Sequence, residues 1–305
     1  MDNAVIETIR KGVQTSLMSP LEVKLAERLL QLHPWFHGIR YSKTGGEAMA
    51  MAVRLARAAT GREKVFFSGY HGWHDWYLAA NLANSEALDG QLMPGLSPTG
   101  VPRSLKETSF PLDLDDIEKS VINANVLPDE VAAFVVEPAR GVAVGAETLE
   151  ELRKYCDRNG VVLIFDEITS GFRICVGGMH RLENCKPDVA VLAKAMANGY
   201  SVAAVMGVES VMESAQSSFI SSTNWTESTG FAAAIATIDK YEATNASTHI
   251  NAMGKEIKRV WATGFADHGI DCDVSGIDSL PAFKFNGPDE LSFYNFFVSE
   301  MVKRG

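Results

Sequence analysis

Two residues of opposite charge each close a short apolar run, and together they could do chemistry. Asp166 follows the run Val161–Phe165, and Lys194 ends the run that begins at Asp188. Such runs are typical of buried strands in a parallel sheet, whose carboxyl ends meet at one edge. A lysine amine can form an imine with an aldehyde, and a carboxylate can keep a pyridine nitrogen protonated. The pair predicts a site for pyridoxal phosphate (PLP).

A glycine turn upstream could bind an anion. The run Thr44-Gly45-Gly46-Glu47 lies between a predicted strand and a predicted helix. Glycines let backbone amides approach an anion, and a helix N-terminus offers unpaired N–H groups. Taken alone, the run favours an ordinary helix cap, with Thr44 or Glu47 in the capping role.

Further residues of the right types follow two other predicted strands. Tyr70 and His71 lie in a glycine-flanked aromatic segment, which could stack on a planar ring or simply pack. Glu137 is a third charge at a strand end. The chain has neither the GxGxxG nor the GxxxxGK[ST] pattern, which weakens the dehydrogenase and nucleotide-binding alternatives.

The elements that must position these residues alternate between strand and helix. Apolar runs predict strands at 36–41, 64–67, 131–136, 161–166, 189–193 and 202–208. Helices are predicted at 21–32, 47–59, 113–124, 147–158 and 227–242, with a long loop at 84–110. This alternation predicts an α/β fold with a mostly parallel central sheet and helices on both faces.

The last part of the chain changes character. A helix at 248–262, strands near 271–274 and 282–285, and a helix from about 289 predict a smaller α+β region. We therefore expect an N-terminal helical segment at 1–20, a large PLP-binding domain at 21–245 and a partial C-terminal small domain at 246–305.

Composition limits the class of function. The 305 residues include 28 basic and 38 acidic ones, for a net charge of −10. This balance argues against general binding of nucleic acid or anionic membranes, and no apolar stretch approaches the roughly 18–20 residues of a membrane span. The four cysteines lack metal-ligand spacing, so we expect reduced thiols, no metal site and a cytoplasmic location.

Several stretches, in this order, resemble the class III PLP-dependent aminotransferases, especially the glutamate-1-semialdehyde aminomutase-like branch. They lie between residues 20 and 245 and are Thr44-Gly-Gly-Glu-Ala, Ala52-Val-Arg-Leu-Ala-Arg57, Gly69-Tyr-His-Gly72, Val136-Glu-Pro138, Phe165-Asp-Glu-Ile-Thr-Ser-Gly-Phe-Arg173, and Lys186-Pro-Asp188 leading to Lys194. The resemblance implies a fold type I PLP-dependent transferase.

The resemblance also implies roles for single residues. Lys194 would bind the cofactor covalently and later carry a proton, and Asp166 would pair with the pyridine nitrogen. Tyr70 and Ile168 would cover the two ring faces. Gly45 and Gly46 would hold the phosphate, and Thr44, His71 and Glu137 would complete the cofactor site. Thr223 would reach the phosphate of a neighbouring subunit, which implies a homodimer with sites at the interface.

The implied substrates are a small-molecule amino donor and a carbonyl acceptor. Transamination and a 2,1-aminomutase reaction would use the same residues, so both stay open. The chain departs from the family pattern at Lys43, where a serine or asparagine is usual, and at Val142, where some members have a glutamate. Family members extend further at both ends, so the chain resembles a member truncated at both ends. This leaves a third possibility, a non-catalytic relative acting as a scaffold or subunit.

Overall fold

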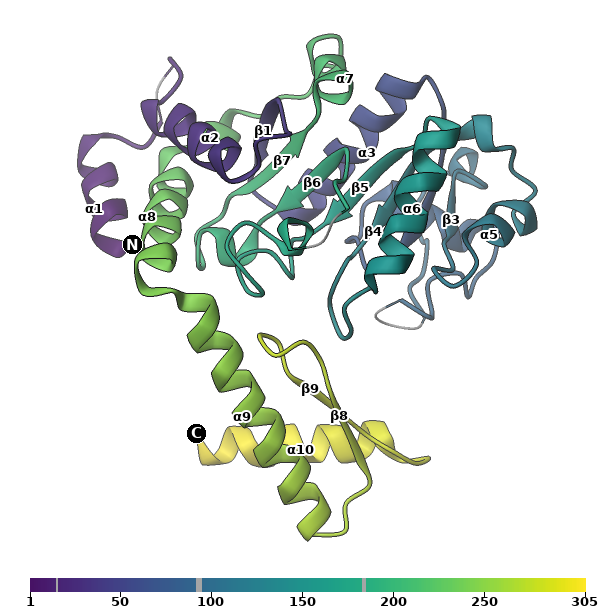
Figure 1. Cartoon of the computed structure of the whole chain (residues 1–305), viewed down its shortest axis with the longest axis vertical. Coiled ribbons are helices and arrows are strands. Elements are labelled where there is room, and N and C mark those ends of the chain that lie inside the picture. Colours follow the sequence, from purple (N-terminus) through teal and green to yellow (C-terminus); the bar gives the residue numbers. More distant parts are fainter. Residues whose placement is uncertain (15, 92–94, 183–184) are drawn as a thin grey trace.

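A computed structural model describes residues 1–14, 16–91, 95–182 and 185–305. Within these residues the central sheet has seven strands in the order β1-β7-β6-β5-β4-β2-β3 (Figure 1). Their bounds are β1 Gly38–Ser42, β2 Lys64–Ser68, β3 Ser109–Pro111, β4 Val131–Val136, β5 Val162–Asp166, β6 Val189–Leu192 and β7 Ala203–Gly207. Strand β7 runs antiparallel to β1 and to β6, and the other pairs are parallel. The predicted mostly parallel sheet is confirmed.

Helices cover both faces of this sheet, as predicted (Figure 1). Helix α3, Gly45–Thr60, packs on one face against residues such as Val135, Ile164 and Val191. On the other face, α2 (Pro20–Leu32) and α8 (Ser228–Thr244) cover β6 and β7. Helices α5 (Ile117–Asn123) and α6 (Ala146–Asn159) cover β4 and β5. Helix α1, Asp2–Lys11, packs on α8, and the short helices α4 and α7 are Asp75–Leu78 and Glu209–Met212.

The central strands are readable in the sequence because both of their faces are buried. Every residue of β4, β5, β6 and β7 is buried, so these strands are continuous apolar runs. Strand β3 was not predicted and lies at the end of the expected loop 84–110. It has three residues and ends in Pro111, which a sheet edge tolerates because one side of an edge strand needs no N–H donor.

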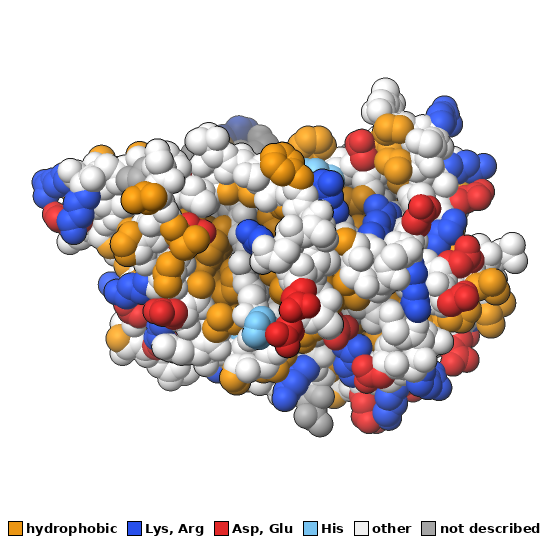
Figure 2. All heavy atoms as spheres, turned by 90° about the horizontal axis from the view of Figure 1, so that it is seen from above, with side chains coloured by type: hydrophobic (Ala, Val, Ile, Leu, Met, Phe, Trp, Pro, Cys, Tyr) orange, Lys and Arg blue, Asp and Glu red, His pale blue; other side chains and the backbone are white. Residues whose placement is uncertain are grey.

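The C-terminal part forms a separate small layer below the large domain in Figure 1. Helix α9, Ala246–Asp267, leads into an antiparallel hairpin of β8 (Cys272–Ser275) and β9 (Ala282–Phe285), and α10 spans Glu290–Arg304. Phe283 contacts the rings of Trp261, Phe265 and Phe297. On the opposite end of the molecule, acidic and basic side chains are interspersed (Figure 2).

A membrane span would require a long apolar helix. In residues 1–14, 16–91, 95–182 and 185–305, no helix has both the length and the apolar character to cross a bilayer.

Candidate active site

A cavity of about 1240 Å³ opens at the carboxyl edge of the sheet. Strands β1, β2, β4, β5 and β6 point the same way, so the residues that follow them meet there. The cavity is lined by all but one of the residues that the sequence suggested, namely Thr44, Gly45, Gly46, Tyr70, His71, Glu137, Asp166, Ile168 and Lys194. The exception is Thr223, which is exposed on a 3-10 turn, Thr223–Thr226, outside this cavity lining.

Asp166 is the deepest charge of the site. It is the last residue of β5, and only 2% of it is exposed. Its Oδ2 lies 2.8 Å from Nδ1 of the buried His71, and its Oδ1 accepts from the backbone N–H of Ile168 at 3.1 Å. A carboxylate has room for further donors beyond these, so Asp166 is held in place with capacity left for a ring N–H.

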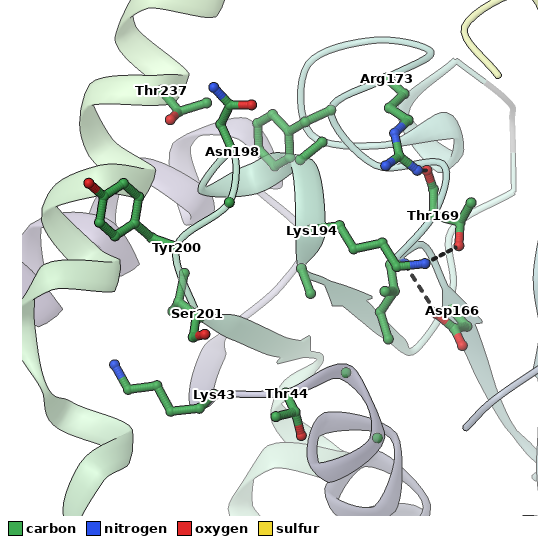
Figure 3. Close-up of a pocket in the computed structure, with 18 of the residues that line it drawn as sticks. Lys43, Thr44, Asp166, Thr169, Arg173, Lys194, Asn198, Tyr200, Ser201 and Thr237 are labelled. Carbon is green, nitrogen blue, oxygen red and sulfur yellow. Dashed lines mark hydrogen bonds between the residues drawn. The ribbon is translucent and has the colours of Figure 1, made fainter. Parts of the chain in front are cut away.

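Lys194 extends into the cavity from a turn just after β6 (Figure 3). Its Nζ donates to Thr169 Oγ1 at 3.0 Å. Burial of the amine, together with the positive charges of Arg140 and Arg173, lowers the pKa of Lys194 although its side chain is open to the cavity. The backbone at Lys194 has φ of 43°, a left-handed conformation that residues with a Cβ rarely adopt.

The N-terminus of α3 forms the third wall of the cavity. Thr44 and Glu47 make a capping box, in which Thr44 Oγ1 accepts from Glu47 N and Glu47 Oε2 accepts from Thr44 N. The cap leaves the amides of Gly45 and Gly46, which have no intrahelical acceptor because they open the helix. The run 44–47 can therefore be both a helix cap and an anion-binding turn. The cap uses the N–H groups of Thr44 and Glu47, and an anion would use those of Gly45 and Gly46.

The two glycines bring this helix end close to its neighbours. A Cβ at Gly45 would lie 2.9 Å from Cδ1 of Ile168, and one at Gly46 would lie 2.6 Å from the His74 ring. A larger residue at either position would force Ile168, the His74 ring or the helix itself to shift, so the missing side chains allow this close approach at the cavity wall. The donors fit a phosphate group, which helix N-termini bind through backbone amides.

The buried Glu137 and the half-buried Arg140 form an ion pair beside Tyr70. Arg140 Nε and Nη2 donate to the Glu137 carboxylate at 2.7 to 3.0 Å, and Glu137 Oε2 also accepts from Tyr70 N at 3.0 Å. The Arg140 guanidinium lies 5.8 Å from the centre of the Tyr70 ring. Gly69 has φ of 112°, and a Cβ there would lie 2.8 Å from Glu137. The pair therefore fixes the loop that presents Tyr70 to the cavity.

The structure adds residues that the sequence reasoning missed. Thr169 accepts from both Lys194 and Arg140 through its hydroxyl, and its carbonyl accepts from Arg173 at 2.7 Å. Thr169 lies three residues after Asp166, and Arg140 lies three residues after Glu137. This three-residue spacing could have indicated that both residues belong to the site, because a tight turn after a strand returns the third residue towards the strand end.

A second buried cluster lies beneath the loop that follows Asp166. Glu167 accepts from Met179 N and His180 N at 2.6 and 2.9 Å, and from the His180 ring and the Ser170 hydroxyl. The ring of His33 lies 4.9 Å from that of His180. Burial, followed by the charge of His180, lowers the pKa of His33 to about 3. This cluster fixes the loop that carries Ile168, Thr169 and Arg173.

The donor set suits an organic phosphate cofactor. In the part of the chain that the structure describes, no group of three or more His, Cys, Asp or Glu side chains could hold a metal ion. A carboxylate held for a ring nitrogen, an amine with a lowered pKa and free amides for a phosphate lie around one cavity, and all three fit PLP.

Known proteins share both sequence and fold with this chain. The family model of class III aminotransferases matches residues 2–263. The chain is 32% identical to a 3-aminobutyryl-CoA aminotransferase of Cloacimonas acidaminovorans, covering 96% of this chain and 69% of that protein. It is 30% identical to a glutamate-1-semialdehyde 2,1-aminomutase of Methanopyrus kandleri, covering 95% and 68%.

A solved structure agrees with these relatives. An omega-transaminase from Sphaerobacter thermophilus superposes with a TM-score of 0.79 at 25% identity, covering 93% of this chain and 67% of that one. The chain thus spans about two thirds of the length of each of these three proteins. With its sheet, its cavity and its sequence in agreement, the chain belongs to the class III aminotransferases, PLP-dependent enzymes of fold type I that transfer amino groups.

Proposed function

We propose that this protein is a transaminase that moves an amino group from a small-molecule amine to a carbonyl acceptor, with Lys194 as its catalytic residue. The observation that carries the proposal is the placement of the Lys194 amine, the Asp166 carboxylate and the N-terminus of α3 around one cavity. Bound PLP supplies an aldehyde that condenses with amines and a ring that accepts electrons from the neighbouring carbon.

In this proposal Lys194 performs the acid–base work. Its lowered pKa leaves more of the amine neutral near pH 7 than an ordinary lysine would have. A neutral Nζ can take a proton from a substrate carbon and return it to another atom. The hydrogen bond to Thr169 Oγ1 orients the Lys194 amine. The same Thr169 hydroxyl also accepts from Arg140, so Thr169 links the two residues.

The remaining residues bind and orient. Asp166, held by His71, would keep a ring N–H charged, because a buried carboxylate stabilises a nearby positive charge. The amides of Gly45 and Gly46 would hold the phosphate. Tyr70 and Ile168 would cover the ring faces and exclude water from them. Thr44, through the capping box, would keep the helix end in register with these groups.

The experiment that tests this proposal is borohydride reduction in the presence of PLP, followed by peptide mapping. We expect the label on Lys194 and its loss in Lys194→Ala, together with a fall in activity of at least about a thousand-fold. Lys43→Ala is a matched control, because Lys43 lines the same cavity but its Nζ is paired with Glu227 at 2.8 Å. Labelling of Lys43 in place of Lys194, or full activity in Lys194→Ala, would overturn the proposal.

A 2,1-aminomutase is the second candidate, supported by the identity to the Methanopyrus kandleri protein. The two reactions differ in stoichiometry. A transaminase needs a second, amino-carrying partner and releases two products, whereas a mutase returns one isomer from one substrate. Incubation of the PLP-loaded protein with single amino-aldehydes or with amine and keto-acid pairs separates them by product analysis.

We further propose that the protein is a cytoplasmic homodimer. We also propose that each chain comprises an N-terminal helical segment at 1–20, a large PLP-binding domain at 21–245 and a C-terminal small domain at 246–305. The cysteine spacing supports a reducing compartment. Thr223 and the 89%-exposed Phe219 support a subunit interface close to the cavity. Light scattering measures the mass in solution, and a monomer that turns over substrate would exclude the interfacial role of Thr223.

A further inference from the structure

The Thr169 hydroxyl is shared by two side chains that carry, or can carry, a positive charge. Lys194 Nζ donates to Thr169 Oγ1 at 3.0 Å (Figure 3). Arg140 Nη2 donates to the same oxygen at 3.2 Å. Only 3% of Thr169 is exposed, so water screens this contact poorly. An amine that can lose its proton therefore shares one buried oxygen with a guanidinium that always keeps its charge.

Arg140 is held in this position by several contacts. Its Nη2 carries two hydrogens, of which one is donated to Glu137 at 2.7 Å and the other to Thr169. Its Nε also donates to Glu137, at 2.9 and 3.0 Å, and its guanidinium lies 5.8 Å from the centre of the Tyr70 ring. Thr169 belongs to the loop that the buried Glu167 fixes. Both the donor and the shared oxygen are thus set in place by the fold.

The two charge states of Lys194 use the shared oxygen differently. An ammonium brings a second positive charge to an oxygen that already accepts from a guanidinium, and two like charges at hydrogen-bond distances repel each other. A neutral amine can donate one N–H to the same oxygen without that repulsion, and it keeps a lone pair that this hydrogen bond does not use. The shared acceptor therefore favours the neutral amine and fixes the direction of one of its N–H bonds.

Charged groups face Lys194 from the segments that follow β4 and β5. Burial lowers the pKa of the Lys194 amine most, Arg140 and Arg173 lower it further, and Asp166 and Glu137 raise it. Among these charges Arg140 has the largest effect, although its counter-charge Glu137 lies beside it. Ionisable side chains also line the cavity from other elements, namely Lys43, Tyr70, His71, Tyr200, Lys240 and Tyr241. These six stay the same in the variants compared below, so the differences between variants report on Arg140, Thr169 and Glu137.

We propose that Arg140 is a positioning residue for Lys194, which keeps the amine neutral and aligned by donating to the same Thr169 oxygen. The inference rests on the proposed amino transfer, in which Lys194 exchanges a proton with the substrate carbon. In this role Arg140 acts through Thr169 and needs no contact with the substrate. A guanidinium at position 140 and a hydroxyl at position 169 are both required for it.

Chemical labelling tests the charge state of the amine without requiring turnover. The full-length protein, free of cofactor, is treated with acetic anhydride over a range of pH, and the label on Lys194 is measured by peptide mass spectrometry. Arg140→Gln should raise the pKa of Lys194, so that its labelling near neutral pH falls by about 10-fold or more, because a neighbouring cation is lost. Thr169→Ser should keep the wild-type profile, because the hydroxyl remains. Arg181→Gln is the matched control, since Arg181 lies on the same loop as Thr169 and donates to Val176 O but does not line the cavity.

A double-mutant cycle separates an effect through Thr169 from an effect through space. In Thr169→Val the shared oxygen is gone, so adding Arg140→Gln to that variant should change the labelling of Lys194 by less than about 3-fold. An effect of Arg140→Gln that is as large in the Thr169→Val background as in the wild type would overturn the inference. The absence of any effect of Arg140→Gln in the wild type would overturn it as well.

A second variant keeps the test available if Arg140→Gln does not fold. That variant leaves the buried Glu137 without its counter-charge, which is destabilising. Glu137→Gln combined with Arg140→Gln removes both charges together. The combined variant should still raise the pKa of Lys194, because Arg140 has a larger effect on that pKa than Glu137 has. An unchanged or lowered pKa of Lys194 in the combined variant would contradict the role of Arg140.

The outcomes separate this inference from the proposed function. Anhydride labelling of Lys194 that does not respond to Arg140 would overturn the role of Arg140 while amino transfer stands. Failure of borohydride to label Lys194 in the presence of PLP, with no amine turned over, would overturn the amino transfer. The anhydride labelling would then still decide whether Arg140 sets the charge state of the Lys194 amine.

Discussion

The large domain and the C-terminal layer obey different packing rules. Each residue of β5 in the large domain is buried, whereas in β8 of the C-terminal layer half-buried and exposed residues alternate. Helix α3 buries a full face against the sheet, but α10 leaves Leu291, Phe296 and Val302 between 67 and 76% exposed. The candidate active site belongs mainly to the buried large domain. Among the described residues that line the cavity, only Ala246, Ile250 and Ser279 come from the C-terminal layer.

The sharpest test of this contrast is a pair of core truncations. Phe165 in β5 is fully buried, and Phe165→Ala should lower the free energy of unfolding by about 3–5 kcal/mol. Phe283 in β9 is half-buried, and Phe283→Ala should cost less than half as much. Urea unfolding followed by circular dichroism measures both.

A milder variant keeps the core comparison decisive if Phe165→Ala does not fold. Phe165→Leu should cost about 1.5 kcal/mol or less and remain measurable. Equal losses for the two alanine variants would show that the C-terminal layer is as firmly packed as the sheet.

A buried histidine gives the second test, through pH. The pKa of His33 is lowered from 6.5 to about 3, first by burial. Between pH 6.5 and pH 3, His33 is protonated in the unfolded chain but stays neutral in the folded chain. The free energy of unfolding therefore decreases as the pH falls through this range. The slope approaches about 1.4 kcal/mol per pH unit, measured by urea unfolding between pH 7 and pH 5.

His268 of the C-terminal layer provides the control for this pH dependence. Its Nδ1 lies 2.8 Å from the carbonyl four residues before it, as the Nδ1 of His33 lies 2.7 Å from Leu29 O, but His268 is exposed. His33→Gln should flatten the pH dependence of stability and His268→Gln should not. The same flattening in both variants would contradict the assignment to burial.

Helix caps give the smallest expected effect. Thr44 caps α3 through its side chain, and its replacement by alanine should cost about 1 kcal/mol. Asp289 precedes α10 without a side-chain cap hydrogen bond, so Asp289→Ala should change the free energy of unfolding by less than about 0.5 kcal/mol. Thermal unfolding midpoints compare the two, and a larger loss in Asp289→Ala would reverse the expected order.

The sequence predicted what depends on local pattern. Strands such as Val131–Val136 were readable because both faces are buried, and Lys194 and Asp166 were found because they end such runs. Strand β3 was missed because three edge residues carry no apolar period. The convergence of Arg140, Arg173 and Lys194 on Thr169 could not be predicted, since it depends on how two loops from different strands fold over one another.

The left-handed backbone at Lys194 sets stability against chemistry at that position. A residue with a Cβ in this conformation costs about 1–2 kcal/mol relative to the right-handed form, and glycine alone avoids the cost. Lys194→Gly should therefore have a larger free energy of unfolding than Lys194→Ala, and both variants should lack amino-transfer activity. Lys194 thus lowers the stability of this turn, and in the proposed reaction its amine is the group that glycine could not supply.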